Sequence, residues 1–351
     1  MPHKVLVTGA CGLVGSETVK ALVANGRQVV ATDLDTPANR RTAQKFGSAA
    51  VRWTDLTDRA ATQALIADVA PTAIVHLAAI IPPFCYAQRA LARSVNVNAT
   101  ADLIRIAESQ PNPPRFVQAS SIAVYGARNP NRFPDVLTVD TPVSPVDNYG
   151  GHKIEVEKLL TASTLEWVVL RLGGVVPAEP NLGIDKDSLY FEAILPANNR
   201  MHTVDVRDVG LAFATAVSAH FSHEVLLIGG DDTHRQHHGD LTPAFTSAMG
   251  MPGILPDKLP GDPSDDLAWF HTDWMDCERA QALLSYQQHS WPSLMAELSE
   301  KVGWKRPLFR LAAPLARRYL RGAAPPALTS SYADPWEMIR QRWGNPEPDR
   351  T

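Results

Sequence analysis

The 351-residue sequence has little cysteine, no long apolar run and no strong excess of charge of either sign. Its cysteines, Cys11, Cys85 and Cys277, are odd in number and far apart, so neither a disulfide framework nor a zinc ribbon is indicated. No stretch is long and apolar enough to cross a bilayer, and no signal-peptide pattern follows Met1. We therefore expect a cytoplasmic protein without stable membrane insertion.

The net charge is only −4, so the basic surface typical of nucleic-acid-binding proteins is missing, and we expect no nucleic-acid partner. Apolar residues make up 45% of the chain, enough to bury a substantial core. Residues 305–351 are the exception in charge, because nine Lys or Arg there outnumber four Asp or Glu. We expect this basic C-terminal extension to contact an acidic surface, such as the rest of the chain.

Short runs rich in Val, Ile and Leu alternate with longer helical patterns over the first half of the chain. This alternation predicts an α/β fold with a Rossmann-like, doubly wound parallel sheet. Strands are expected near residues 4–8, 28–33, 49–53, 73–77, 115–120 and 167–172, and helices near 13–25, 58–69, 86–109 and 145–163.

The alternation loosens after about residue 173, where prolines and polar loops become frequent. We expect residues 1–173 to form the Rossmann domain, with 203–230 returning to it. Residues 174–304 then form mainly a smaller C-terminal substrate lobe, followed by the extension at 305–351.

A glycine-rich segment follows the first expected strand, with Gly9, Gly12 and Gly15 before and within a helix start. Glycine lets the backbone approach a pyrophosphate at a helix N-terminus. The spacing differs by one residue from G-x-G-x-x-G, and an ordinary strand-helix turn is the alternative. The expected cofactor-binding residues of this loop are Gly9, Cys11, Gly12, Leu13, Val14 and Gly15.

Asp33 ends the second expected strand, about 20 residues beyond the glycine loop, where a carboxylate can accept hydrogen bonds from an adenosine ribose. The same charge repels a 2′-phosphate, so we predict NAD rather than NADP. Arg40 and Arg41 lie close enough to keep NADP open. In isolation, Asp33 is equally well explained as a helix cap.

Tyr149 and Lys153 stand four residues apart in a helix that Ser144 is expected to cap, so both side chains share a face. An ammonium nearby favours a phenolate, which makes Tyr149 a candidate general acid/base. Such a pair is common by chance, and its value comes from its place after the fifth strand. Ser121 ends that strand and can hold a substrate oxygen, with Ser120 as its competitor.

In combination, these motifs resemble the extended branch of the short-chain dehydrogenase/reductases, which includes nucleotide-sugar epimerases and dehydratases. The resemblance covers roughly residues 4–215 and includes the segments 8–15, 76–79, 121–126 and 204–209. It implies an NAD-dependent enzyme with Ser121, Tyr149 and Lys153 as the catalytic set. It favours Ser121 over Ser120, because the family's hydroxyl residue lies four before the tyrosine of its VYG segment.

The resemblance also implies contacts with the cofactor outside the glycine loop, with Lys153 holding the nicotinamide ribose. It implies a homodimer by analogy. The implied cofactor-binding residues are Asp55 and Leu56 at the adenine, Leu77, Ala78 and Ala79 at the midsection, Asn96 at the pocket, and Tyr149, Lys153, Leu172 and Gly173.

Two departures from the family bear on the substrate. Ile122 and Ala123 stand where the family's dehydratases carry an acidic pair, and they cannot protonate a leaving hydroxyl. This argues against a sugar 4,6-dehydratase. Gly174 stands where sugar-nucleotide enzymes tend to place an asparagine, so the usual diphosphate anchor is missing.

We therefore predict an NAD-dependent oxidoreductase that passes hydride between nicotinamide and a carbinol or ketone of a small-molecule substrate. The alternative is a sugar or nucleotide-sugar epimerase, which uses the same residues for transient oxidation and would retain NAD through purification. A third reading is an NAD(H)-sensing protein without turnover, against which the intact catalytic set argues.

Three weaker signals remain in the C-terminal half. We expect the histidines at 234, 237 and 238 to be solvated, and we assign no metal to them. Trp269, Phe270 and Trp274 form either an apolar substrate wall or part of the core.

The stretch 308–321 places Leu308, Leu311 and Leu315 at helical spacing with arginines between them. A membrane-surface helix is one interpretation of this pattern. We prefer packing on the body or on a second subunit, because the stretch is short and contains Pro314.

Overall fold

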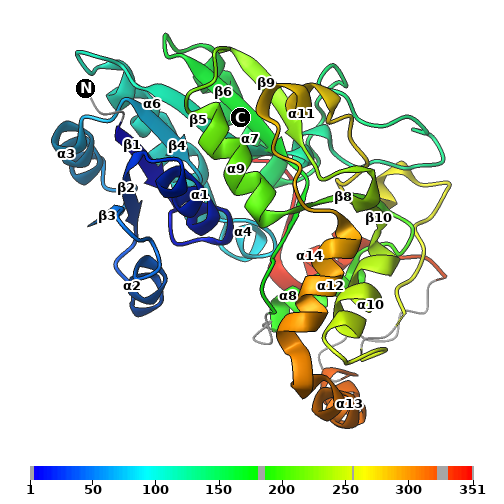
Figure 1. The fold of residues 1–351 in the computed structure, drawn as a ribbon. Coiled ribbons are helices and arrows are strands. Elements are labelled where there is room, and N and C mark those ends of the chain that lie inside the picture. The colour runs from blue at the N-terminus through cyan, green and yellow to red at the C-terminus, as the bar shows by residue number, and fades with distance from the viewer. Residues whose placement is uncertain (1–3, 181–185, 255–256, 322–330, 350–351) are drawn as a thin grey trace.

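A computed structural model describes residues 4–180, 186–254, 257–321 and 331–349. Its centre is a sheet of parallel strands in the order β3-β2-β1-β4-β5-β6-β9 (Figure 1). The strand order reverses between β1 and β4, which is where ligands bind in open α/β sheets. The strands are β1 (Lys4–Thr8), β2 (Gln28–Asp33), β3 (Ala50–Trp53), β4 (Ala73–His76), β5 (Arg115–Ser121), β6 (Trp167–Leu172) and β9 (Glu224–Ile228).

Helices cover both faces of this sheet, so its strands are buried on both sides. One face packs against α1 (Leu13–Ala24), α9 (Val206–Ala216) and α11 (Glu278–Leu284). The opposite face packs against α3 (Arg59–Val69), α6 (Thr100–Glu108) and α7 (Asn148–Thr161). The expected Rossmann-like α/β fold is confirmed.

A smaller sheet lies beside the main one, in the order β10-β8-β7. It joins β7 (Gly174–Val176), β8 (Arg200–Asp205) and β10 (Arg235–His237), and α10 (His238–Ala248) and α12 (Trp291–Val302) share a separate apolar cluster near it. The helix α8 (Lys186–Ile194) belongs to the same half of the molecule (Figure 1). The domain boundaries given above remain our proposal.

Several elements differ from the expectation. The strand β9 and the small sheet were not predicted, nor was α2 (Pro37–Ala43). The helix expected at 86–109 is divided into α4 (Phe84–Ala87), α5 (Arg89–Arg93), a π-helical turn η1 (Ser94–Ala99) and α6. Short 3₁₀ turns are η2 (Ile122–Tyr125), η3 (Asp232–His234), η4 (Asp266–Ala268) and η5 (Gly303–Lys305).

The expected start of the helix bearing Tyr149 was wrong. The helix α7 begins at Asn148, and Asp147 is its N-cap because its carboxylate accepts from the Gly150 amide at 2.9 Å. Ser144 lies outside the helix, and its amide donates to Val124 O.

The C-terminal extension contains α13 (Arg306–Arg321) and α14 (Pro335–Trp343). The helix α13 projects at the lower end of the molecule, whereas the segment 344–349 runs back to α7 (Figure 1). Arg342 pairs with Asp187 at 2.7 Å, as expected for a basic extension on an acidic group. Asp349, an acidic residue of the extension, makes the reverse kind of contact, because it pairs with the basic residues Arg89 and Arg93 of the body. Within the described residues, no helix is long and apolar enough to cross a membrane.

Candidate active site

The glycine loop connects β1 to α1 at the carboxyl edge of the sheet. Gly9 has φ +62°, and a Cβ there would lie 2.7 Å from the Ala78 amide nitrogen. A Cβ at Gly15 would lie 2.1 Å from Gly9 O, so the loop and the helix touch through backbone alone. Gly12 caps α1 without a side-chain hydrogen bond. The N-terminal amides of α1, including those of Leu13 and Val14, therefore face outward without a side-chain partner, which fits a pyrophosphate.

Asp33 lies at the end of β2 and is bound to the glycine loop. Its Oδ2 accepts from the Cys11 amide at 2.8 Å, and its Oδ1 accepts from Leu34 N at 2.8 Å. Arg40 forms an exposed ion pair with Asp35. Burial and the Asp33 carboxylate together raise the pKa of the Cys11 thiol to about 11, so it stays protonated at neutral pH.

Residues after β3 and β4 line the same edge. Asp55 and Leu56 follow β3, where the exposed Asp55 accepts from Thr57 N at 2.9 Å. The Leu77 amide donates to Thr8 O, and the Ala78 backbone lies against Gly9. Since β1 and β4 are paired, the residues Leu77 to Ala79 lie beside the glycine loop.

His76 belongs to the scaffold of the site. Its Nδ1 lies 2.7 Å from Thr8 Oγ1, and its Nε2 lies 2.9 Å from Thr100 Oγ1. Burial, aided by Lys153, lowers the pKa of His76 to about 3, so the ring is neutral. It ties β1 and β4 to the start of α6.

Asn96 lies in the π-helical turn η1 and binds the loop that follows β4. Its Oδ1 accepts from Ile80 N at 2.7 Å, and its Nδ2 donates to Ile80 O at 2.9 Å. The same amide lies 3.4 Å from His152 Nδ1 on α7. Asn96 thus fixes the backbone of Ile80, the residue after Ala79, through both its amide and its carbonyl group.

The two serines at the end of β5 have different environments. Ser120 is buried, and its Oγ lies 2.5 Å from Glu157, which also pairs with Arg171. Ser121 is partly exposed and caps η2 by accepting from Ala123 N at 3.2 Å. Its hydroxyl is near enough to Tyr149 to act on the pKa of the phenol. The structure therefore brings Ser121, and not Ser120, to the tyrosine.

Tyr149 and Lys153 lie on one face of α7, next to the end of β5. Lys153 Nζ donates to Ala119 O at 2.9 Å and lies 5.5 Å from the centre of the Tyr149 ring. Burial lowers the pKa of Lys153 to about 8, against the opposing effect of Glu157. Burial raises the pKa of Tyr149, and the nearby Ser121 hydroxyl opposes that rise. The net direction is opposite to the lowering we expected from Lys153.

Backbone contact fixes the distance between η2 and the first turn of α7. A Cβ at Gly150 would lie 2.5 Å from Ala123 O, so no other residue fits there without movement. At the end of β6, Gly173 follows Leu172, and its amide donates to Ile228 O at 2.9 Å. Both residues lie at the carboxyl end of β6, and Gly173 approaches β8, since a Cβ there would lie 2.4 Å from His202 O.

A buried polar group beside Tyr149 was not predicted from the sequence. Asp147 Oδ2 accepts from Tyr86 OH at 2.7 Å and lies 3.4 Å from His271 Nε2. Burial alone raises the pKa of Asp147, but His271, Tyr86 and the Gly150 amide hold it below its ordinary value. These contacts span residues 86 to 271, so no local pattern could have revealed them.

Aromatic residues pack against Tyr149 on the side of the lobe. Of the three aromatic residues singled out in the sequence, Phe270 belongs to this cluster. Trp269 is fully buried with its Nε1 on Asp262 O, and Trp274 lies under the Arg200 guanidinium. The extension supplies two that were not predicted. The cluster around Tyr149 contains Ile80, Tyr86, Phe191, Phe270, Trp336 and Trp343.

The expectation of solvated histidines was wrong for two of the three. His234 is buried with its Nδ1 2.8 Å from Thr203 Oγ1. His238 is buried near Lys258, and burial lowers its pKa to about 3. Of the three, His237 is the one that is partly exposed. The described residues contain no cluster that could hold a metal ion.

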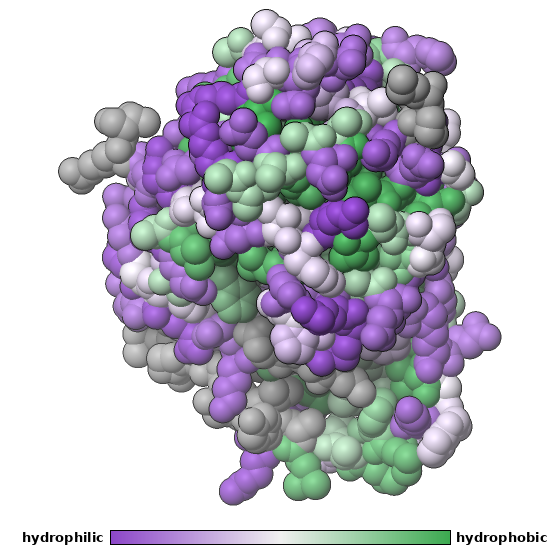
Figure 2. Space-filling model, turned by 90° about the vertical axis from the view of Figure 1, so that its left-hand side faces the viewer, coloured by the Kyte–Doolittle hydropathy of each residue, from purple (hydrophilic) through white to green (hydrophobic). Residues whose placement is uncertain are grey.

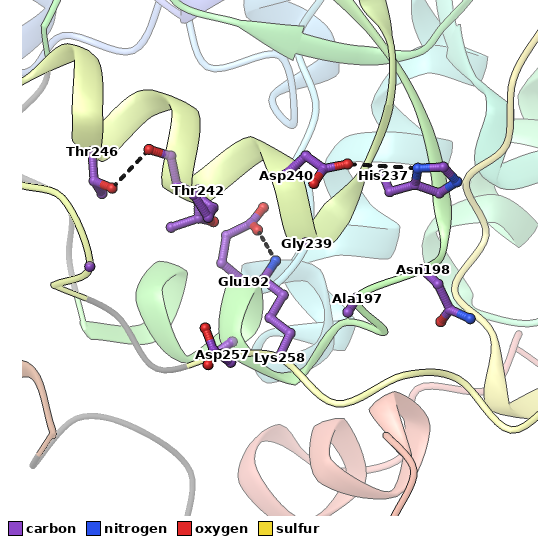
Figure 3. A pocket seen from close by; sticks show the side chains of 13 residues that line it. Glu192, Ala197, Asn198, His237, Gly239, Asp240, Thr242, Thr246, Asp257 and Lys258 are labelled. Carbon is purple, nitrogen blue, oxygen red and sulfur yellow. Dashed lines mark hydrogen bonds and ion pairs between the residues drawn. The ribbon is translucent and has the colours of Figure 1, made fainter.

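A cavity of about 580 Å³ lies in the C-terminal half, between α8 and α10 (Figure 3). Glu192 and Lys258 form an ion pair of 2.9 Å in its wall, and Asp240 and Asp257 add further acidic groups. The wall therefore carries more negative than positive charge. This does not favour a phosphate group there.

Comparison with known proteins gives the family. A model of the NAD dependent epimerase/dehydratase family matches residues 5–182. The chain belongs to this family. The expected NAD-dependent enzyme of the extended short-chain type is thereby confirmed, with NAD as its cofactor. The uncapped start of α1, Asp33 and the Lys153 ammonium fit this dinucleotide.

Curated relatives match part of the chain. UDP-glucose 4-epimerase of Lactobacillus helveticus is 29% identical over 204 residues, 55% of this chain and 58% of that protein. D-erythronate dehydrogenase of Cupriavidus necator is 32% identical over 190 residues, 50% of this chain and 57% of that protein. The chain thus spans somewhat over half the length of these two relatives.

Solved structures show the same fold over more of the chain. The NAD complex of UDP-glucose 4-epimerase from Thermus thermophilus aligns with a TM-score of 0.69 at 20% identity, covering 85% of this chain and 98% of that one. The NAD complex of the Bordetella bronchiseptica enzyme WbmH aligns with a TM-score of 0.68 at 22% identity, covering 88% and 99%.

Proposed function

We propose that this chain is an NAD-dependent sugar epimerase that inverts a carbinol carbon through transient oxidation. The observation that carries the proposal is the meeting of Ser121, Tyr149 and Lys153 at the end of β5, in a chain of this family. Among the relatives, UDP-glucose 4-epimerases favour this reading over the simple dehydrogenase that we expected first.

Tyr149 exchanges the hydroxyl proton of the substrate, and Ser121 orients the oxygen through its hydroxyl. Because burial raises the Tyr149 pKa, the phenol is the resting form and is suited to the protonating half of the cycle. Lys153 provides a positive charge that favours the phenolate in the half of the cycle that removes the proton. Its ammonium has three N–H donors, and Ala119 O is the one acceptor found for them among the described residues. The remaining donors would hold the nicotinamide ribose. Bound NAD supplies the hydride acceptor.

Other residues would bind the cofactor along the carboxyl edge. The proposed pyrophosphate site is the glycine loop with the start of α1, and the proposed ribose acceptor is Asp33. The segments 55–56, 77–79 and 172–173 and Asn96 would flank the rest of the dinucleotide. These proposed roles rest on the position of the three segments at or just after the ends of β3, β4 and β6, and on the contact of Asn96 with the loop after β4.

UDP-sugars are the first substrate class to assay, because the epimerase relatives carry that name. Gly174 and the acidic cavity wall argue that the lobe does not hold a diphosphate in the usual way. Sugars without a nucleotide therefore belong in the same assay. A dehydrogenase of a sugar acid is the second candidate, favoured by the 32% identity to D-erythronate dehydrogenase.

The test begins with the cofactor released from denatured, purified protein, identified by mass spectrometry. Stoichiometric NAD, with conversion of UDP-glucose or a free sugar to its epimer and no build-up of NADH, would support the epimerase. NADH produced with D-erythronate would replace it by the dehydrogenase. Binding without any turnover across the sugar panel would favour the sensing protein.

The catalytic set is tested by Tyr149→Phe, which should bind NAD as the wild type does but lose turnover by roughly 10²–10⁴-fold. A variant with unchanged turnover would remove Tyr149 from the mechanism. The homodimer and the cytoplasmic location also remain predictions, to be tested by light scattering and by fractionation.

A further inference from the structure

The helix α13 and the turn η5 that precedes it expose a row of apolar side chains. Trp304, Leu308, Leu311 and Leu315 follow one another at spacings of four, three and four residues, which places them on one helical face. Their exposed fractions are 77%, 53%, 79% and 75%. Green apolar groups gather at the lower end of the molecule, where α13 projects (Figure 2). This face therefore does not pack on the body. Packing on a second subunit, the other half of our preferred expectation, stays a prediction.

Basic residues surround the apolar row. The segment 304–321 contains six Lys or Arg and no Asp or Glu. Within the described part of the chain, Lys305, Arg306, Arg310, Arg317 and Arg318 form no ion pair. Arg306 donates to Ser247 O, which anchors the start of the helix to the lobe. The positive charge is thus available to an external partner.

The helix touches the body by another part of its surface. Ala313 is buried, and the Arg306 backbone lies against Gly250. With 16 residues, α13 is about 24 Å long, which is too short and too charged to cross a bilayer. Its geometry suits a helix lying in the plane of a surface.

We propose that α13 docks the protein on the surface of a bilayer containing anionic phospholipids. The leucines and Trp304 would enter the boundary between headgroups and acyl chains, while the arginines meet the lipid phosphates. This inference goes beyond the proposed function and does not depend on it.

Two other partners fit less well. A second copy paired through this face would bring two segments of six positive charges together, with no acidic residue in either to offset them. A nucleic acid would satisfy the arginines but leave the leucine row in water. Only a surface that is both anionic and apolar below its charged layer matches both features.

The experiment is co-sedimentation of the full chain with vesicles of phosphatidylcholine alone and of phosphatidylcholine with phosphatidylglycerol. We expect binding to the anionic vesicles, weakened by salt and roughly tenfold weaker on neutral ones. The double variant Leu311→Glu with Leu315→Glu should lose about tenfold in affinity for the anionic vesicles. A wild type that ignores anionic vesicles, or a double variant that binds equally well, would overturn the proposal.

A matched control makes the same change in charge elsewhere. Val139→Glu with Leu267→Glu alters two exposed apolar residues outside α13, and it should leave vesicle binding within about twofold of the wild type. Circular dichroism and NAD binding verify that both double variants are folded. Light scattering without vesicles covers the remaining case. If the α13 variant changes the oligomeric state and the wild type does not bind vesicles, a second copy covers this face and the membrane proposal fails.

Discussion

His152 Nε2 lies 2.9 Å from Asp349 Oδ2, and this contact joins the helix bearing Tyr149 to the C-terminal segment. Asp349 also binds Arg89 and Arg93, and His152 reaches Asn96 on its other side. Asn96 in turn holds both backbone groups of Ile80, so a continuous set of contacts runs from Asp349 to the loop beside the glycine segment.

We predict that Asp349→Asn weakens NAD binding by roughly threefold to tenfold. The substitution weakens the contact with His152, and His152 is the residue that contacts Asn96. Calorimetric titration with NAD measures the affinity. The control is Glu347→Gln, in the same segment but exposed. Equal affinities for the two variants would show that the contact does not reach the cofactor site.

The same variant should alter stability in acid. Burial alone raises the Asp349 pKa, but His152 and Arg93 hold it below its ordinary value. A lowered pKa gives stabilisation that is complete above the ordinary aspartate range and is lost as the pH falls through the native pKa. The wild type should therefore lose more stability than Asp349→Asn on acidification, as urea titrations at a series of pH values would report.

Asp147→Ala should destabilise the protein by about 3 kcal/mol, since it removes a helix cap and leaves Tyr86 and His271 without their buried partner. Asp58→Ala is the matched control, because Asp58 caps α3 on the exposed surface. That variant should lose only about 1 kcal/mol. Similar losses in urea unfolding would mean that the buried contacts of Asp147 add nothing to its cap.

The pKa of Lys153 predicts an alkaline limit to catalysis. With a value of about 8, the ammonium loses its proton above that pH and with it the charge that supports Tyr149. We expect kcat/KM to fall above about pH 8, and we expect Lys153→Arg to retain low activity with this limb moved to higher pH. A limb that stays in place in Lys153→Arg would assign the ionisation to another group.

Asp33→Asn tests the cofactor preference. The amide still accepts from Cys11 N, but the charge that excludes a 2′-phosphate is gone. The preference for NAD+ over NADP+ should narrow by roughly tenfold in binding titrations. Asp35→Asn provides the comparison, since Asp35 lies nearby and pairs with Arg40. If Asp33→Asn keeps the preference of the wild type, residues other than Asp33 discriminate between NAD+ and NADP+.

The sequence was most informative where the determinants are local. Six strands and the glycine loop follow from short apolar runs and glycine spacing, and the structure has them within a residue or two. The cap of α7 was misassigned because Ser144, Pro145 and Asp147 all suit a helix start, and only the hydrogen bond to Gly150 decides between them.

The rest of the site depends on contacts between distant segments. Asp147 meets His271, and the cluster at Tyr149 recruits Trp336, a residue with no local pattern to mark it. The buried state of His234 and His238 likewise depends on the small sheet and the lobe around them. The polar composition of this loop predicted that the histidines are exposed to solvent, but packing against distant segments buries His234 and His238.

The backbone contact between Gly150 and Ala123 holds together the two elements that carry Ser121 and Tyr149. It keeps the backbone of η2, which follows Ser121, close to the backbone of the first helical turn of α7, which bears Tyr149. The aromatic cluster and the acidic cavity come from segments that do not set this distance. On the proposed function, substitutions in the lobe and the C-terminal extension should change substrate choice and leave the backbone spacing of Ser121 and Tyr149 unaltered.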